Sequence, residues 1–342
     1  MNRAVPKIGG SPGAEHPLAN ADRTLVTGIR DGDRRALAKA ITLIESTRRD
    51  HQPRGQAVLE ALLPHTGRSI RVGISGAPGV GKSTFIEAFG LHLIKEGHRV
   101  AVLAVDPSST VTGGSILADK TRMEELSRAA QAFIRPSPTG GSLGGVAART
   151  RETLLVCEAA GFDVIVVETV GVGQSETAVA RMTDMMVLLQ MPNAGDDLQA
   201  IKKGIVELAD LIVINKADLD PQLARHAQHT IKSALAFVRP SSPNWQPPVL
   251  ALSGISGDGI ATFWSEVLRY HDTMQATGEF AARRRGQALD WMWTLIDARL
   301  RADFRAHLGI GTLLPATLDE VAAGHLTPAM AAERLLARAR KD

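Results

Sequence analysis

The sequence has 342 residues, of which 44% are hydrophobic and 22% are charged, as in a folded globular protein with one large core. The formal net charge of +3 is too small to indicate a nucleic-acid or membrane partner by itself. The single cysteine, Cys157, excludes an internal disulfide and any multi-cysteine metal site. No apolar run approaches the roughly 20 residues of a membrane span, and the first 20 residues lack a secretion or transit signal, so a cytoplasmic location is expected.

A small helical segment is predicted before the first strand. Between residues 21 and 63 the apolar positions recur at near-helical spacing, and Asp31-Gly32-Asp33 supplies a break and a helix cap. The chain before this segment is rich in proline and glycine. We therefore assign residues 1–56 to a flexible tail and a helical N-terminal extension.

Strands and helices then alternate through residues 57–276. The expected strands are rich in Val, Ile and Leu with little polar alternation, which is typical of parallel strands buried on both faces. They are Ile70–Ser75, Arg99–Asp106, Asp163–Glu168, Met185–Met191, Leu211–Asn215 and Val249–Ser253. The segment from Arg135 to Gly145 has loop-like composition. The sequence thus predicts an α/β domain with a mostly parallel sheet covered by helices.

After Asp258 the strand signals stop, and only helices are expected. Their predicted ranges are Gly259–Ala276, Phe280–His307, Leu318–Ala323 and Pro328–Arg340. The second helix is apolar on more than one side, through Leu289, Trp291, Met292, Trp293, Leu295 and Ile296. Such a helix needs partners on two sides, so we interpret residues 277–342 as a helical dimerisation extension. The alternative is that both faces pack within one chain.

A phosphate-binding loop is predicted at the end of the first strand. Gly76-Ala77-Pro78-Gly79-Val80-Gly81-Lys82-Ser83 matches G-x-x-x-x-G-K-[ST] and stands between that strand and a helix that runs from Lys82 to about Glu96. The backbone N–H groups of such a loop converge on phosphate oxygens, together with those of the first helical turn, which includes Thr84. Lys82 would reach the β- and γ-phosphates, and Ser83 would bind Mg²⁺.

A guanine-reading loop is predicted after a later strand. Asn215-Lys216-Ala217-Asp218 follows the buried run Leu211–Ile214, at the edge where α/β sheets bind ligands. The Asp218 carboxylate can accept hydrogen bonds from two guanine donors that adenine lacks, which selects GTP over ATP. Lys216 would lie along the base, and Asn215 would join the loops. Ser253-Gly254-Ile255, after the next strand, is a candidate second contact to the base.

Two carboxylates end two other strands. Asp106 and Glu168 would lie beside the phosphate-binding loop if their strands neighbour the first one, where they could hold Mg²⁺. Glu168 begins an E-x-x-G whose glycine could respond to the γ-phosphate. Asp119, which follows a Gly-Gly pair, could reach the same phosphates. The alternative for Asp106 and Glu168 is a role as helix caps.

Together these motifs resemble one family. The matching segments are the phosphate-binding loop, Asp106-Pro107-Ser108-Ser109, residues 113–122 and Glu168-Thr169-Val170-Gly171-Val172-Gly173-Gln174-Ser175. They look like the MeaB/ArgK/MMAA family of methylmalonyl-CoA mutase-associated P-loop GTPases. The resemblance implies a homodimeric GTPase chaperone that binds a cobalamin-dependent acyl-CoA mutase, gates adenosylcobalamin loading, and protects or reactivates the mutase. It also assigns nucleotide and Mg²⁺ roles to Lys82, Ser83, Asp106, Asp119 and Glu168, and guanine recognition to Asp218.

The segment from Met191 to Lys202 resembles an additional switch that responds to the partner. We interpret Lys202 as a catalytic cation that the partner repositions during hydrolysis. The competing interpretation is a solvated helix start that Asp196 caps.

Three other functions stay open on the sequence. A nickel metallochaperone would need metal ligands, and the candidates are only His226 and His229. A small-molecule kinase would need an acceptor pocket with a base, and the sequence indicates neither. A pure binding module would bind GTP without releasing phosphate.

Overall fold

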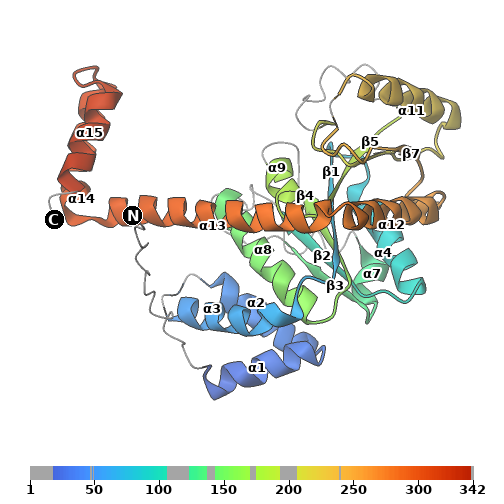
Figure 1. Cartoon of the computed structure of the whole chain (residues 1–342), viewed down its shortest axis with the longest axis horizontal. Helices are drawn as coiled ribbons and strands as arrows, with labels where there is room; N and C mark the ends of the chain where they lie inside the picture. The colour runs from blue at the N-terminus through green and yellow to red at the C-terminus, as the bar shows by residue number, and fades with distance from the viewer. Residues whose placement is uncertain are drawn as a thin grey trace, which may run out of the picture. The chain divides into compact units, whose positions relative to one another are not determined.

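The computed structural model describes residues 18–46, 48, 50–105, 123–136, 143–169, 175–192, 206–238 and 240–339 (Figure 1). The chain forms two compact units, which divide between Phe280 and Ala281. No helix in the described ranges is long and apolar enough to cross a membrane.

The second unit is helical. It contains most of α13 (Glu279–Ala306), together with α14 (Leu308–Ala322) and α15 (Pro328–Ala339). An ion pair of 2.9 Å between Arg334 and Glu320 joins α15 to α14. Helix α14 begins ten residues before the predicted Leu318, because its two glycines and the internal Pro315 hide the helical pattern in the sequence.

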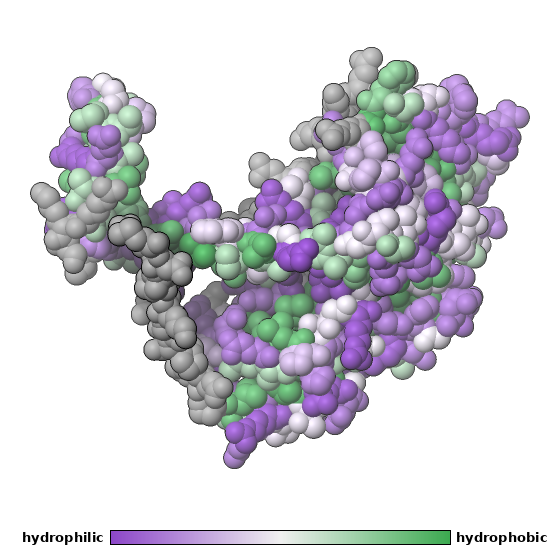
Figure 2. All heavy atoms as spheres, in the orientation of Figure 1, coloured by the Kyte–Doolittle hydropathy of each residue, from purple (hydrophilic) through white to green (hydrophobic). Residues whose placement is uncertain are grey.

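Large apolar side chains lie exposed along α13. Figure 2 shows hydrophobic residues on the surface of this helix between polar ones. The exposed members are Leu289, Met292, Trp293, Leu295, Ile296 and Leu300. Large apolar side chains are thus exposed along α13 in the part of the chain that the structure describes.

Three helices form the N-terminal extension: α1 (Asn20–Arg30), α2 (Arg34–Glu45) and α3 (His51–Leu62), followed by a 3₁₀ turn at Leu63–His65. Asp33 caps α2 by accepting a hydrogen bond of 2.7 Å from the Arg35 N–H, as the sequence predicts. An ion pair between Arg54 and Asp22 ties α3 to α1. The apolar faces of α1, α2 and α3 enter the same buried cluster as α8 (Leu143–Ala159).

The first unit is built on a parallel sheet of seven strands in the order β3-β2-β4-β1-β5-β6-β7. The strands are β1 (Ile70–Gly76), β2 (Val100–Val105), β3 (Ala132–Arg135), β4 (Val164–Thr169), β5 (Met185–Gln190), β6 (Leu211–Ile214) and β7 (Val249–Ala251). This confirms the predicted fold class and all six predicted strands. Strand β3 was not predicted. The loop expected over Arg135–Gly145 is wrong at both ends, because Arg135 ends β3 and α8 begins at Leu143; residues 137–142 lie outside the described ranges.

Helices cover both faces of the sheet. The N-terminal helices and α8 pack on one face with α9 (Ser175–Ala180). On the other face lie α4 (Lys82–Lys95), α7 (Glu124–Arg128) and α12 (Ile260–Ala276). Helix α11 (Pro221–Leu235) packs beside β6 and β7 in a smaller cluster.

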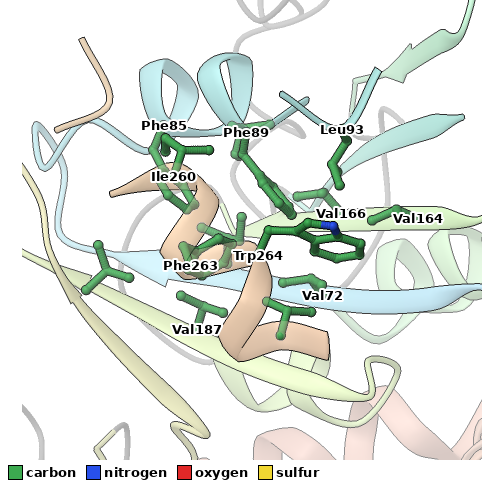
Figure 3. Close-up of a cluster of buried hydrophobic side chains, with 14 of the residues drawn as sticks. Val72, Phe85, Phe89, Leu93, Val164, Val166, Val187, Ile260, Phe263 and Trp264 are labelled. Atoms are coloured by element: carbon green, nitrogen blue, oxygen red, sulfur yellow. The ribbon is translucent and has the colours of Figure 1, made fainter. Parts of the chain in front are cut away.

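An aromatic cluster fixes α4 against the sheet (Figure 3). The Phe263 ring of α12 meets Phe85 and Phe89 of α4 edge-on, at centroid distances of 5.0 and 4.9 Å. Trp264 lies beside Phe89, and all four side chains are buried. Burial of this much aromatic surface stabilises the position of α4. The loop that leads into α4 is therefore anchored at both of its ends, by β1 and by this cluster.

Candidate functional site

The predicted phosphate-binding loop joins β1 to α4 at the carboxyl end of the sheet. Gly76 ends β1, residues 77–79 are exposed, and Lys82 begins α4. Gly81 has a φ of 91°, and a Cβ there would lie 2.8 Å from the Asn215 side-chain nitrogen. Only glycine satisfies both the left-handed backbone and this close approach. The backbone N–H groups in the first turn of α4 and the helix dipole make this loop suited to bind anions.

Lys82 folds back over the loop. Its ammonium donates hydrogen bonds to the carbonyl oxygens of Gly76 at 2.7 Å and Ala77 at 3.3 Å. The positive charge is thus held at the mouth of the loop, where it can interact with phosphate oxygens.

Asn215 joins the phosphate-binding loop to the two loops after β6 and β7. Its side-chain nitrogen donates to the Val80 carbonyl at 2.9 Å, and its side-chain oxygen accepts from the Gly254 N–H at 3.0 Å. Asn215 itself is buried. A buried amide with both ends bonded fixes the relative position of the three loops.

Lys216 contacts the phosphate-binding loop directly. Its ammonium donates to the Gly79 carbonyl at 2.8 Å. Among the described residues it is the one non-glycine with a left-handed backbone, at φ 60°. Residues held in this region are uncommon and mark positions that the surrounding structure determines. The aliphatic stem of Lys216 spans from the guanine-reading loop to the phosphate-binding loop.

Asp218 is exposed and available for a ligand. Asp220, two residues later, caps α11 by accepting hydrogen bonds from the N–H groups of Gln222 and Leu223. Asp218 has no hydrogen bond or ion pair with any described residue. Of the two nearby carboxylates, one is committed to the fold, and the other can accept hydrogen bonds from a base.

The third loop, at Ser253-Gly254-Ile255, approaches α4 closely. A Cβ at Gly254 would lie 3.0 Å from the Phe85 Cα, so a side chain at this position would crowd the backbone of α4. The buried Ser253 hydroxyl accepts hydrogen bonds from the N–H groups of Ile255 and Ser256. Since the Gly254 N–H is bonded to Asn215, these three donors are already in use. A base contact at this loop stays a prediction and would have to share one of these bonds.

Glu168 lies at the end of β4, directly beside β1. It is buried, and the Ser83 hydroxyl lies 3.5 Å from one of its carboxylate oxygens. The register pairs Glu168 with Ile74 of β1. Asp106 follows β2, which is separated from β1 by β4, so only Glu168 meets the condition that its strand neighbours the first one.

Three predicted site residues lie outside the described ranges: Asp106, Asp119 and Lys202. The two histidines considered as nickel ligands, His226 and His229, are exposed on α11. In the described ranges no group of three or more His, Cys, Asp or Glu side chains is arranged to hold a metal ion.

The family model described as "Methylmalonyl Co-A mutase-associated GTPase MeaB" matches residues 37–308. The chain belongs to the MeaB family. It is therefore a GTPase, which binds guanine nucleotide and hydrolyses GTP to GDP and phosphate.

Relatives in distant organisms support this membership. A Caulobacter vibrioides protein is 55% identical over 306 residues, which cover 90% of this chain and 94% of its own. GTPase ArgK of Escherichia coli is 52% identical, over 77% of this chain and 80% of its own. The mouse protein "Methylmalonic aciduria type A homolog, mitochondrial" is 48% identical, over 91% of this chain and 78% of its own.

A solved structure shares the whole architecture. The crystal structure of a LAO/AO transport system kinase superposes with a TM-score of 0.77 at 38% identity and covers 95% of this chain and 99% of that one. The alignment with that structure extends over most of this MeaB-family chain and is not limited to the sheet.

One pair of polar residues beside the site was not predicted from the sequence. Ser75 and Thr169 lie at the ends of β1 and β4, and the Thr169 hydroxyl donates to the Ser75 hydroxyl at 3.0 Å. Both are fully buried. The sequence does contain a signal for this pair, since each apolar strand carries one hydroxyl residue next to a motif. Ser75 precedes Gly76 of the phosphate-binding loop, and Thr169 follows Glu168.

Proposed function

We propose that this MeaB-family GTPase acts in the cytoplasm as a chaperone and regulator of a cobalamin-dependent acyl-CoA mutase, namely methylmalonyl-CoA mutase. It would gate the loading of adenosylcobalamin and protect or reactivate the mutase. The observation that carries the proposal is the match of residues 37–308 to a family described as mutase-associated. The relative named for methylmalonic aciduria supports the same link.

In this proposal the described residues bind the nucleotide in a fixed orientation. Phosphate oxygens replace the two backbone carbonyls as partners of the Lys82 ammonium. Asp218 accepts hydrogen bonds from guanine, and the Lys216 stem covers the face of the base. Because Asn215 joins the base loops to the phosphate-binding loop, both ends of the nucleotide are held by one connected unit.

The residues beside the phosphate-binding loop fit Mg²⁺. Ser83 and Glu168 offer a hydroxyl and a carboxylate oxygen 3.5 Å apart, and oxygen donors are the ligands that Mg²⁺ prefers. We propose that Ser83 and Glu168 hold the ion with Asp106 and Asp119. At such a position a divalent cation neutralises the charge that develops on the β- and γ-phosphate oxygens.

Acceleration by the mutase tests the proposal directly. GTP hydrolysis is measured alone and with the cognate methylmalonyl-CoA mutase, and the rate is expected to rise by an order of magnitude or more in the presence of mutase. If Lys202 is the repositioned cation, Lys202→Ala keeps the intrinsic rate and loses the acceleration. Lys232→Ala, at an exposed lysine of α11, is the control and should respond like the wild type.

Two results would contradict these assignments separately. A wild-type protein whose rate the mutase leaves unchanged, and which a pull-down does not recover with the mutase, removes the regulatory function. A Lys202→Ala variant that the mutase accelerates normally removes only the switch assignment, in favour of a capped helix start.

We also propose that the chain works as a homodimer through the exposed apolar side chains of α13. Replacing Met292 and Trp293 by Glu should give a monomer in light scattering, because two charges cannot be buried in an apolar interface. A dimer of unchanged mass would place the interface elsewhere.

A further inference from the structure

We propose that the buried Ser75–Thr169 hydroxyl pair is a positioning contact for GTP hydrolysis, which holds the end of β4 in register with the phosphate-binding loop. Ser75 immediately precedes Gly76, the first residue of that loop, and Thr169 immediately follows Glu168. Their hydrogen bond of 3.0 Å is therefore one residue away from the site on both strands.

The two faces of the sheet carry different parts of this arrangement. Successive side chains of a strand point to opposite faces. Ile74 and Val166 lie in the core under α4, and Glu168, two residues after Val166, is on that face with Ser83 of α4. Val167 lies in the core on the α8 side, and Thr169 follows it on that face with Ser75. The hydroxyl pair thus lies on the α8 face of the sheet. It holds together the ends of β1 and β4, which carry Gly76 and Glu168 next to α4.

The surroundings of the pair are tightly packed. A Cβ at Gly73 of β1 would lie 2.8 Å from Val179 of α9 and 2.9 Å from Met186 of β5. Ser75 and Thr169 are 1% and 0% exposed. Water cannot replace a hydrogen bond in such a place, so a lost partner leaves a buried hydroxyl without compensation.

The expected consequence is geometric. The Ser83 hydroxyl of α4 lies 3.5 Å from the carboxylate of Glu168, the residue before Thr169, so a shift of the end of β4 changes this separation directly. A displacement of about 1 Å at a reacting centre can lower a rate by roughly 100-fold. Small shifts of a strand end therefore affect hydrolysis before they affect nucleotide binding, for which many loop contacts remain.

The test is a set of isosteric substitutions measured on the full chain without mutase. Thr169→Val keeps the shape of the side chain and removes the donor, and we expect kcat for GTP to fall about tenfold, with the Kd of fluorescent GTP and GDP analogues changed less than about twofold. Thr169→Ser restores the donor and should restore most of kcat. Ser75→Ala should match Thr169→Val, and the double variant should lose no more than either single variant.

A matched control separates positioning from general destabilisation. Thr150 of α8 is also buried, but its hydroxyl donates to the Val146 carbonyl of its own helix at 3.0 Å. Thr150→Val should leave kcat per nucleotide-binding site unchanged, although it can lower Tm. The proposal is overturned if Thr169→Val retains the wild-type kcat, if Thr169→Ser is as impaired as Thr169→Val, or if Thr150→Val loses as much activity.

The inference rests on the role proposed for Glu168, and the two can fail separately. If Glu168→Ala hydrolyses GTP at the wild-type rate, the proposed site is wrong. If Glu168→Ala is inactive and Thr169→Val is normal, only the positioning contact is wrong. Because every measurement is made without mutase, failure of the regulatory function affects neither result.

Discussion

The two ends of the sheet both carry charged residues, but they use them differently. At the amino end, the Arg71 guanidinium is bonded to both oxygens of Glu158 at 2.8 and 2.9 Å, and Ser69 and the Gly67 N–H donate to the same carboxylate. At the carboxyl end, by contrast, the Lys82 ammonium is bonded to backbone carbonyls. The first arrangement surrounds one buried carboxylate with donors from the protein itself, whereas in the second the phosphate oxygens of a ligand can replace the two carbonyls.

A repeated aspartate strengthens the amino end. The residue before each of β4, β5 and β6 is an aspartate: Asp163, Asp184 and Asp210. Their carboxylates accept hydrogen bonds of 2.8 to 2.9 Å from backbone N–H groups at the start of neighbouring strands. Charge at this end therefore stabilises strand pairing, and charge at the other end is available for function. The comparison predicts that substitutions at the two ends affect different measurements.

The largest effect is expected at the buried ion pair. Glu158→Gln leaves the Arg71 guanidinium buried without a counter-charge, which should lower the free energy of unfolding by about 3–5 kcal/mol. Urea denaturation at pH 7 measures this change. Hydrolysis per folded molecule should stay at the wild-type rate, because the pair lies at the opposite end of the sheet.

A compensating double variant checks the cause. Replacing Arg71 by Met and Glu158 by Leu removes both charges together, and such exchanges are often neutral or stabilising. Recovery of most of the lost stability would assign the loss to the unpaired charge. A double variant as unstable as Glu158→Gln would instead assign it to packing.

The next effect belongs to the carboxyl end. Lys82→Ala removes the mobile cation from the phosphate-binding loop and should lower kcat/KM for GTP by about 10²–10³-fold, equivalent to about 3–4 kcal/mol. The free energy of unfolding should change little, because the bonds lost are partly exposed contacts to backbone carbonyls. Phosphate-release kinetics and urea denaturation are measured on the same preparation. Wild-type hydrolysis would remove Lys82 from the site.

Much of the fold could be predicted because buried parallel strands leave continuous apolar runs. All six predicted strands exist, with ends shifted by one or two residues. Strand β3 was not predicted because it has only four residues, Ala132–Arg135. They alternate between buried and partly buried positions and end in an arginine, so they leave no continuous apolar run. Helix α14 was underestimated because Gly309, Gly311 and Pro315 are poor helix formers in isolation, while packing against α15 sustains the helix.

The site was predictable where a motif fixes both residue type and position. The phosphate-binding loop and the Asn215-Lys216-Ala217-Asp218 loop lie together at the carboxyl end, because parallel strands end at one edge. Strand order was not predictable, and it places β2, the strand before Asp106 in the sequence, one strand further from β1 than β4, which carries Glu168. The Ser75–Thr169 bond also depends on strand order, since residues 94 apart in the chain meet only when β1 and β4 are neighbours.

A smaller effect is expected at the guanine-reading loop. Asp218→Asn turns one acceptor into a donor, so the preference for GTP over XTP should shift toward XTP by about 100-fold or more. Asp220→Asn is the matched control, since Asp220 caps α11 and should leave the base preference unchanged. Competition binding with GTP, ATP and XTP measures the preference. An Asp218 variant that keeps the wild-type preference would exclude this carboxylate as the base reader.

The smallest effect on stability is expected at the Ser69 hydroxyl, which donates a hydrogen bond to Glu158 at the amino end of the sheet. Burial opposes ionisation of Glu158, but the bonds from Arg71, Ser69 and the Gly67 N–H outweigh it and lower the pKa of this carboxyl. A lowered folded-state pKa contributes stability above the ordinary glutamate pKa of about 4.3, and this contribution is lost as the pH falls through the folded-state value. Ser69→Ala removes one charge-assisted bond and should cost about 1.5 kcal/mol at pH 7.

The pH dependence of that loss identifies its origin. Without the Ser69 bond the pKa of Glu158 rises, so the variant should begin to lose stability at a higher pH than the wild type. Once the carboxyl is protonated in both proteins the charge-assisted bond is absent from both, and the difference in unfolding free energy should shrink toward zero. Denaturation curves from pH 7 down to acid measure this convergence, while GTP hydrolysis at pH 7 stays unchanged. A difference that is constant with pH would mean that Ser69 acts through packing and not through the Glu158 charge.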